Sequence, residues 1–186
     1  MLYENTVIPV RAAWSSPFLR WQGPAADLNS VELAEHVTAR ALAERGVDWP
    51  IDELVLGWTI PQKEAFYGAP TLAARLGLAG VSGLMVSQAC ATSVAAIHAA
   101  AASQQGQRDG SRLVITTDRT SNGPHLVYPR TSGPGGTADS ENWVLDSFER
   151  DPVTDESMLA TAERVAAEAG FAKPELDQLT VRRYEQ

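Results

Sequence analysis

Cysteine and basic residues are both scarce in this chain. Cys90 is the only cysteine among 186 residues, which excludes an internal disulfide framework and a metal site built from several cysteines. The 15 lysines and arginines are outnumbered by 23 aspartates and glutamates, and the net charge of −8 argues against a nucleic-acid partner. No apolar run approaches the ~20 residues of a membrane span, and no charged-then-apolar leader opens the chain. We therefore expect a cytoplasmic protein without a membrane span.

Strand-like and helix-like patterns alternate through the first two thirds of the sequence. Short apolar runs predict strands over residues 6–10, 51–60, 81–86 and 112–117. Apolar spacing near 3.6 predicts helices over residues 28–45, 69–76 and 90–105. Asn29 or Ser30 can cap the first of these helices, and Gly46 can end it. Alternation of this kind predicts an α/β fold, with a parallel-rich sheet and helices on both of its faces.

The pattern changes after Asp118. Residues 119–140 are rich in glycine, proline, serine and threonine and show no periodicity, so they predict a long loop of functional importance. Helices are expected over residues 154–169 and from Pro174 onward. We therefore divide the chain into a βα domain over residues 1–118 and a second region over residues 119–186.

Cys90 stands where the third predicted strand passes into the third predicted helix. Ligands of parallel α/β folds bind beyond the carboxyl ends of the strands, so this position faces the functional crevice. A thiol at a helix N-terminus meets unpaired N–H groups and the positive end of the helix dipole, and both favour the nucleophilic thiolate. The alternative is that Cys90 is a small buried hydrophobe, as free cysteines often are.

Four segments carry a family pattern in the same order along the chain. Residues 87–96 read Ser-Gln-Ala-Cys-Ala-Thr-Ser-Val-Ala-Ala, and residues 16–18, after Arg11, read Ser-Pro-Phe. Residues 51–57 read Ile-Asp-Glu-Leu-Val-Leu-Gly, and residues 158–166 read Met-Leu-Ala-Thr-Ala-Glu-Arg-Val-Ala. These segments resemble the thiolase family, in its nucleophile motif Asn-x-x-Cys-x-Ser-Gly-x-x-Ala, its Arg-Thr-Pro-Phe opening, its second strand and its Met-Gly-x-Thr-Ala-Glu-x-x-Ala segment.

The resemblance spans essentially the whole chain and corresponds to the N-terminal half of a thiolase. Two residues depart from the nucleophile motif, because Ser87 replaces asparagine and Ser93 replaces glycine, whereas Thr92 conservatively replaces serine. The implied fold is a thiolase-like layered α/β fold with an incomplete N-terminal half over residues 1–118. Residues 119–186 would begin the inserted loop domain that covers coenzyme A.

The resemblance implies a coenzyme A-dependent acyltransferase. Cys90 would be the nucleophile that carries the acyl group while a 3-oxoacyl-CoA is cleaved or formed by the reverse Claisen condensation. Backbone N–H groups at the helix N-terminus would stabilise the developing oxyanion. Met158 would contact the pantetheine arm, beside Ser157 in place of the histidine that often precedes it. Coenzyme A and acyl-CoA would be substrates, with no tightly bound cofactor and no metal.

Three catalytic elements of the family do not occur in this sequence. These are the Gly-His-Pro histidine, a second cysteine in Cys-x-Gly, and the Asn-Glu-Ala-Phe segment. His98 lies two helical turns beyond Cys90, about 12 Å along the axis, and is too far away to be its base. His36 is expected to be solvated. We expect a second polypeptide to supply the missing half, in a hetero-oligomer with a further dimer contact near Cys90.

Other interpretations stay open on the sequence alone. The chain could be a fragment or a decayed gene product, and in either case an apolar sheet edge would be exposed. A ketosynthase-like condensing enzyme would use the cysteine with other histidines, and a non-catalytic scaffold or acyl-binding subunit would leave Cys90 inert. An unrelated cysteine hydrolase would draw on His125 in the loop.

The region after the fourth predicted strand holds the remaining candidate residues. Asp118 and Arg119 point toward the crevice, where we expect a salt bridge that fixes the loop. Aromatic side chains at Tyr128, Trp143 and Phe148 are expected to form a loop core rather than an acyl pocket. Residues 133–136 are rich in glycine but lack the spacing and the preceding strand of a phosphate-binding loop.

Overall fold

The computed structural model describes Tyr3 and residues 6–104, 110–130, 132, 136 and 138–185. The chain divides into two compact units, each described here by itself. The first comprises Met1–Ser16 and Ala25–Arg119, and the second comprises Pro17–Pro24 and Thr120–Gln186. These units are not the two domains predicted from the sequence, because residues 17–24 belong to the second unit. The domain boundary after residue 118 stays a prediction.

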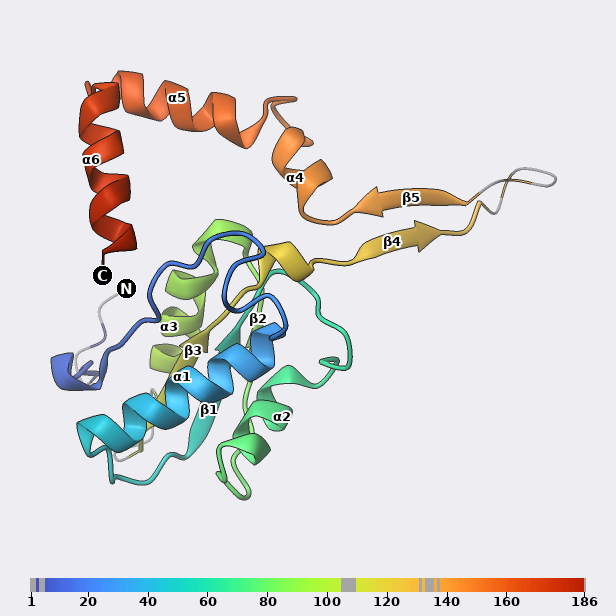
Figure 1. Cartoon of the computed structure of the whole chain (residues 1–186). Coiled ribbons are helices and arrows are strands. Elements are labelled where there is room, and N and C mark those ends of the chain that lie inside the picture. Colours follow the sequence, from blue (N-terminus) through green and yellow to red (C-terminus); the bar gives the residue numbers. More distant parts are fainter. Residues whose placement is uncertain are drawn as a thin grey trace. The chain divides into compact units, whose positions relative to one another are not determined.

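The first unit is built on a parallel sheet of three strands (Figure 1). The strands are β1 (Glu53–Gly57), β2 (Met85–Val86) and β3 (Arg112–Thr116), in the order β2-β1-β3. Leu56 is paired with Met85 on one side and with Ile115 on the other, so β1 is the central strand. The predicted α/β class with a parallel sheet is confirmed.

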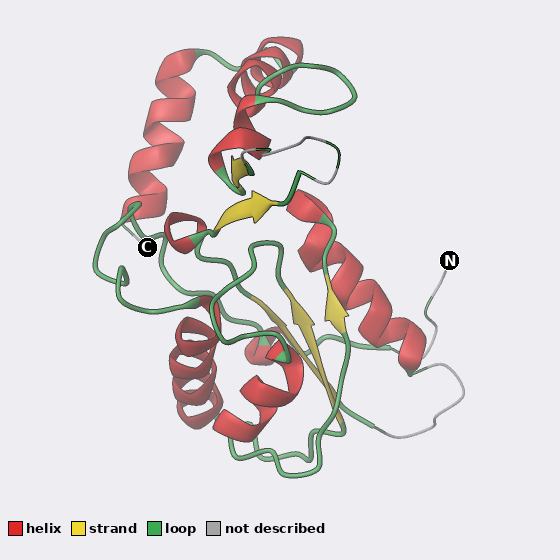
Figure 2. Ribbon diagram, turned by 90° about the vertical axis from the view of Figure 1, so that its right-hand side faces the viewer, coloured by secondary structure: helices red, strands yellow, loops and turns green. Residues whose placement is uncertain are grey.

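Helices cover both faces of this sheet, as Figure 2 shows. Side chains alternate between the two faces of a strand. Leu54 and Leu56 therefore pack on one side against α1 (Ser30–Arg45) and α2 (Gly68–Arg75), whereas Val55 packs on the other side against α3 (Thr92–Ser103). Leu54, Val55 and Leu56 are fully buried, which explains why the sequence of this strand is a continuous apolar run.

Local capping signals set the bounds of α1. The Asn29 side chain accepts the Glu32 backbone N–H at 2.9 Å, and the Glu32 carboxylate accepts the Asn29 N–H at 2.8 Å, which completes a capping box. Gly46 ends the helix in the left-handed conformation at φ 58°. The helix predicted over residues 28–45 is therefore confirmed, although it begins at Ser30 rather than at Leu28.

Replacing Asn29 by alanine should lower the free energy of unfolding by about 1 kcal/mol, because the first turn of α1 loses its side-chain acceptor. Asn29→Ser is the matched control, since a serine hydroxyl can accept the same N–H group. Urea unfolding followed by circular dichroism measures both variants. Equal stability of Asn29→Ala and Asn29→Ser would contradict a capping role.

Three expectations for the first unit are wrong. Residues 6–10 form no strand; Pro9 lacks an N–H and its carbonyl accepts from Ala12 at 2.8 Å, so a 3₁₀ turn, η1 (Val10–Ala12), begins there. The strand predicted over residues 81–86 is reduced to β2 and a single bridge between Ser82 and Glu53. The third helix begins at Thr92 rather than at Cys90.

The second unit contains a hairpin that the sequence reading missed. β4 (His125–Tyr128) and β5 (Asp139–Asn142) pair in antiparallel register, preceded by a 3₁₀ turn, η3 (Thr120–Asn122). The loop predicted over residues 119–140 is therefore wrong. Most of the glycine-rich segment at 133–136 lies outside the described residues. The Tyr128 hydroxyl donates to Glu141 at 2.9 Å, and this hydrogen bond raises the pKa of Tyr128.

Three helices follow the hairpin: α4 (Leu145–Glu149), α5 (Met158–Glu168) and α6 (Lys173–Tyr184). The last two confirm the helices predicted near residues 154–169 and from Pro174. Within the described part of the chain, no helix has the length and apolar character of a membrane-spanning helix. That same part brings together no group of three or more histidine, cysteine, aspartate or glutamate side chains suited to a metal ion.

Candidate active site

Cys90 lies in a short 3₁₀ turn, η2 (Ala89–Ala91), between β2 and α3. Its thiol is free and exposed. The preceding residue, Ala89, adopts a φ of 45°, which is uncommon for a residue with a Cβ and persists only where the surroundings hold it. Because α3 begins two residues later, Cys90 stands immediately before the helix rather than within its first turn. The reading of Cys90 as a buried hydrophobe is wrong.

A pocket of about 250 Å³ includes Cys90 in its wall. The other lining residues belong to the turn, to the start of α3 and to the carboxyl ends of β1 and β3; they are Gly57, Ala89, Thr92, Ser93, Thr116, Thr117 and Asp118. The structure therefore places Cys90 at the carboxyl ends of the parallel strands, where ligands of such sheets bind.

Gly57 allows α3 to approach the end of β1. A Cβ added at Gly57 would lie 2.9 Å from the Cγ2 atoms of both Thr116 and Thr92. Both distances are shorter than real Cβ contacts, so any larger residue would push α3 and β3 apart. The absence of a side chain at this strand end is what brings Cys90 close to the sheet.

The buried hydroxyl of Thr92 holds the turn that carries Cys90. It accepts the Gln88 backbone N–H at 2.8 Å and donates to the Ala89 carbonyl at 2.7 Å. The Thr59 hydroxyl lies 3.1 Å from it and so joins the turn to the segment after β1. Satisfied networks of this kind rigidify their surroundings. They provide the constraint that keeps Ala89 in its unusual conformation.

Asp118 fixes the neighbouring loop through backbone amides. Its carboxylate accepts the N–H groups of Thr59 at 2.9 Å and Ile60 at 2.8 Å. Partial burial raises the pKa of Asp118 above its ordinary value, although the hydrogen bonds from Ile60 and Thr59 act in the opposite direction. Asp118 therefore fixes a loop, as expected, and the loop that it fixes is the segment after β1.

None of the three histidines lines the pocket of Cys90, as far as the described residues show. His36 is exposed on α1, in agreement with the expectation that it is solvated. His98 on α3 makes a short hydrogen bond with the Tyr3 hydroxyl. His125 belongs to β4 in the second unit, where its ring is 3.4 Å from the Asn142 side chain. The described pocket is thus lined by the Cys90 thiol and by no histidine.

Met158 is the half-buried first residue of α5 in the second unit. The preceding Ser157 is the helix N-cap, and its hydroxyl accepts the Ala160 N–H at 3.2 Å. This capping role gives a local reason for serine at the position where the family often has histidine. The contact of Met158 with a pantetheine arm stays a prediction.

Sequence reasoning identified Cys90 but missed the groups that position it. Thr92 was noted only as a conservative replacement in the nucleophile motif, and Gly57 only as a strand residue. A usable signal for Thr92 was its place at the start of an alanine-rich helix, where a hydroxyl bonds to backbone groups. No local signal indicates that Thr59 lies beside Thr92, because the two residues are 33 positions apart.

The family model that matches this chain is described as "Thiolase, N-terminal domain" and covers residues 8–186. Among solved structures, the chain is similar to the acetyl-CoA acetyltransferase of Bacillus anthracis, with 25% identity and a TM-score of 0.69. It is also similar to the acetyl-CoA acetyltransferase of Syntrophomonas wolfei, with 26% identity and a TM-score of 0.67. Human mitochondrial 3-ketoacyl-CoA thiolase, solved in complex with CoA, shares the fold with 19% identity and a TM-score of 0.70.

These similarities extend over most of this chain but over less than half of each solved protein. The Bacillus anthracis and human matches cover 90% of this chain and 43% of the other, and the Syntrophomonas wolfei match covers 88% and 42%. No curated protein sequence matches the chain.

Proposed function

This chain belongs to the thiolase family through its N-terminal domain, and from that premise we propose that it carries the acyl-accepting cysteine of a coenzyme A-dependent acyltransferase. The observation that carries the proposal is the exposed Cys90 thiol in a pocket at the carboxyl ends of β1 and β3. Membership of the thiolase family and the position of this thiol both support acyl transfer through a thioester.

In the cleavage direction, the Cys90 sulfur attacks the C3 carbonyl carbon of a 3-oxoacyl-CoA. The bond between C2 and C3 then breaks; its electron pair goes to C2, which takes up a proton and leaves as acetyl-CoA. The acyl group stays on Cys90 until the thiol of free coenzyme A attacks it and releases a shortened acyl-CoA. Backbone N–H groups at the N-terminus of α3 are the donors that we propose for the oxyanion of each step.

Two proton transfers in this scheme have no histidine or second cysteine to carry them among the residues that line the described pocket. The Cys90 thiol must lose a proton before it attacks, and C2 must gain one when acetyl-CoA leaves. We propose that a second polypeptide supplies the histidine of Gly-His-Pro and a second cysteine for these steps. Met158 in α5 is the residue that we propose for contact with the pantetheine arm of coenzyme A.

Incubation with acetyl-CoA, followed by intact mass measurement, tests the proposal. The chain is incubated alone and together with a polypeptide carrying the part of the Bacillus anthracis acetyl-CoA acetyltransferase that the match leaves uncovered. We expect a mass increase of one acetyl group, mapped by proteolysis to Cys90 and faster in the mixture. Absence of the adduct under both conditions would instead support a non-catalytic thiolase-like subunit.

A further inference from the structure

Hydrogen bonds within the turn that carries Cys90 fix its shape. The Thr92 hydroxyl donates to the Ala89 carbonyl at 2.7 Å and accepts the Gln88 N–H at 2.8 Å. The backbone N–H of Thr92 donates to the same carbonyl. Because these groups lie within four residues of one another, they move together with the turn. They do not determine where the turn lies relative to the sheet.

The hydroxyl of Thr59 adds a bond from outside the turn. Its oxygen lies 3.3 Å from the Ala89 carbonyl oxygen and 3.1 Å from the Thr92 hydroxyl oxygen. A hydroxyl has one proton to donate, and the Thr92 proton already goes to Ala89. The Thr59 proton is therefore the one shared between Ala89 and Thr92. This contact also fills the second acceptor site of the Thr92 oxygen, in a residue that is only 5% exposed.

The position of Thr59 is fixed by two strands of the sheet. Thr59 follows the last residue of β1 by two positions, and Asp118 follows the last residue of β3 by two positions. The backbone N–H of Thr59 donates to the Asp118 carboxylate at 2.9 Å, and the N–H of Ile60 donates to it at 2.8 Å. The Thr59 hydroxyl therefore links the ends of β1 and β3 to a carbonyl that lies 30 positions away in the sequence.

We propose that Thr59 is a positioning residue for Cys90 in acyl transfer, an inference that rests on the proposed function. Thr59 acts through Ala89. The peptide group between Ala89 and Cys90 is planar, so a donor that restrains the Ala89 carbonyl also restrains the N–H and the Cα of Cys90. Thr59 is not among the residues that line the described pocket of Cys90. Its side chain therefore restrains the nucleophile from outside the substrate site.

Replacing Thr59 by valine tests the restraint directly, because valine keeps the branched shape of the side chain and loses the hydroxyl. The turn then keeps its own hydrogen bonds but loses this link to the strand ends. Relaxation of ¹⁵N nuclei in the whole chain measures the result at the Cys90 amide. We expect its order parameter to fall from about 0.85, typical of rigid backbone, toward about 0.6. Thr59→Ser, which retains a donor, should keep the wild-type value.

The rate of Cys90 acetylation shows whether this restraint affects the chemistry. The rate is measured against acetyl-CoA concentration, together with the polypeptide that carries the uncovered part of the Bacillus anthracis enzyme. Thr59→Val should lower the maximal rate about tenfold, because small misplacements of a reacting group are costly. The acetyl-CoA concentration that gives half of the maximal rate should change less than about twofold, since Thr59 lies outside the pocket wall. Thr59→Ser should restore the maximal rate.

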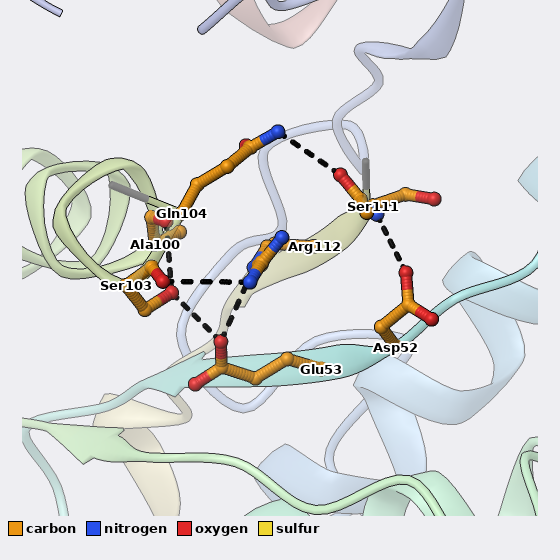
Figure 3. Close-up of polar contacts among 8 residues, drawn as sticks. Asp52, Glu53, Ala100, Ser103, Gln104, Ser111 and Arg112 are labelled. Carbon is orange, nitrogen blue, oxygen red and sulfur yellow. Dashed lines mark hydrogen bonds and ion pairs between the residues drawn. The ribbon is translucent and has the colours of Figure 1, made fainter. Parts of the chain in front are cut away.

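Ser103 provides a matched control at the far end of α3, as Figure 3 shows. Its hydroxyl donates to the carboxylate of Glu53 on β1 at 2.7 Å and lies 3.0 Å from the Ala100 carbonyl oxygen. Ser103 therefore also joins α3 to β1, but about 16 Å from Thr92 along the helix axis. Ser103→Ala should leave the order parameter and the acetylation rate of Cys90 unchanged. Thermal unfolding of each variant checks that the chain is folded.

The inference would be overturned by a Thr59→Val variant with an unchanged order parameter or an unchanged rate, by failure of Thr59→Ser to restore the rate, or by an equal effect of Ser103→Ala. The relaxation measurement does not depend on acyl transfer. Acetylation of Cys90 that is independent of Thr59 would therefore retain the proposed function and reject the positioning role. A turn that loosens only in Thr59→Val, in a chain that acetyl-CoA never labels, would confirm the restraint and reject the proposed function.

Discussion

Replacing Cys90 by serine should abolish the transfer of an acetyl group from acetyl-CoA to this chain. A thiolate is the attacking species in thioester exchange, and a serine hydroxyl in the same place has no histidine to activate it among the residues that line the described pocket. We expect the rate of labelling to fall by at least about 10³-fold, as is typical when a covalent nucleophile is removed. Intact mass against time, with acetyl-CoA in excess, measures this rate.

The composition of the chain makes this experiment unambiguous. No other cysteine exists in the sequence, so any thioester-linked label must be on Cys90. Because Cys90 is exposed, its loss leaves no buried cavity, and Cys90→Ser should unfold at the same temperature as the wild type. Label that persists on a correctly folded Cys90→Ser variant would reject the acyl-cysteine and point to non-specific acetylation.

Replacing Gly83 by alanine should severely destabilise the first unit. A Cβ at this position would lie 1.6 Å from the Leu54 carbonyl oxygen and 2.5 Å from its carbonyl carbon. Both atoms belong to the backbone of the central strand, so no side-chain rotation can relieve the overlap. The neighbouring hydrogen bond from the Leu54 N–H to the Ser82 carbonyl, 3.0 Å long, must break as the segment moves away. We expect a loss of at least about 3 kcal/mol, at the upper end of overpacking effects.

Gly80→Ala is the matched control for this prediction. Gly80 lies three residues earlier, at a φ of +79°, and an added Cβ would meet nothing within 4 Å. Its cost is therefore only the strain of a left-handed residue, about 1–2 kcal/mol. Chemical unfolding followed by circular dichroism compares the two variants. Equal destabilisation would show that the contact between residue 83 and β1 is not maintained in solution.

Sequence reasoning succeeded where the determining contacts are local. The bounds of α1 follow from Asn29, Glu32 and Gly46, which act within one helical turn of the positions that they determine. β1 was identified from a continuous apolar run, because a strand that is buried on both faces shows no alternation of apolar and polar residues. Pro174 likewise indicated the start of α6 within one residue.

Two of the failures, the missed hairpin and the strand predicted over residues 6–10, concern strand pairing that no local pattern indicates. The β4–β5 hairpin joins Tyr128 to Asp139 across a turn-rich segment, and no periodicity within that segment indicates the pairing. Residues 6–10 have strand-forming side chains, yet strand structure requires a neighbour, and in this structure a cavity separates them from β3. Side-chain composition indicates how much apolar surface a strand could bury, but it does not indicate whether a partner strand is present.

The sequence by itself determined the thiolase family, the parallel α/β class and the single candidate nucleophile, because motifs, periodicity and a unique cysteine are properties of the chain alone. Only the tertiary structure decided that Cys90 is exposed just before α3, that Thr92 holds the turn that carries it, and that Gly57 allows α3 to approach the strand ends. The approach of α3 to Gly57 and the link from Thr59 to Thr92 join residues 30 or more positions apart, and such distances are set by packing rather than by local pattern.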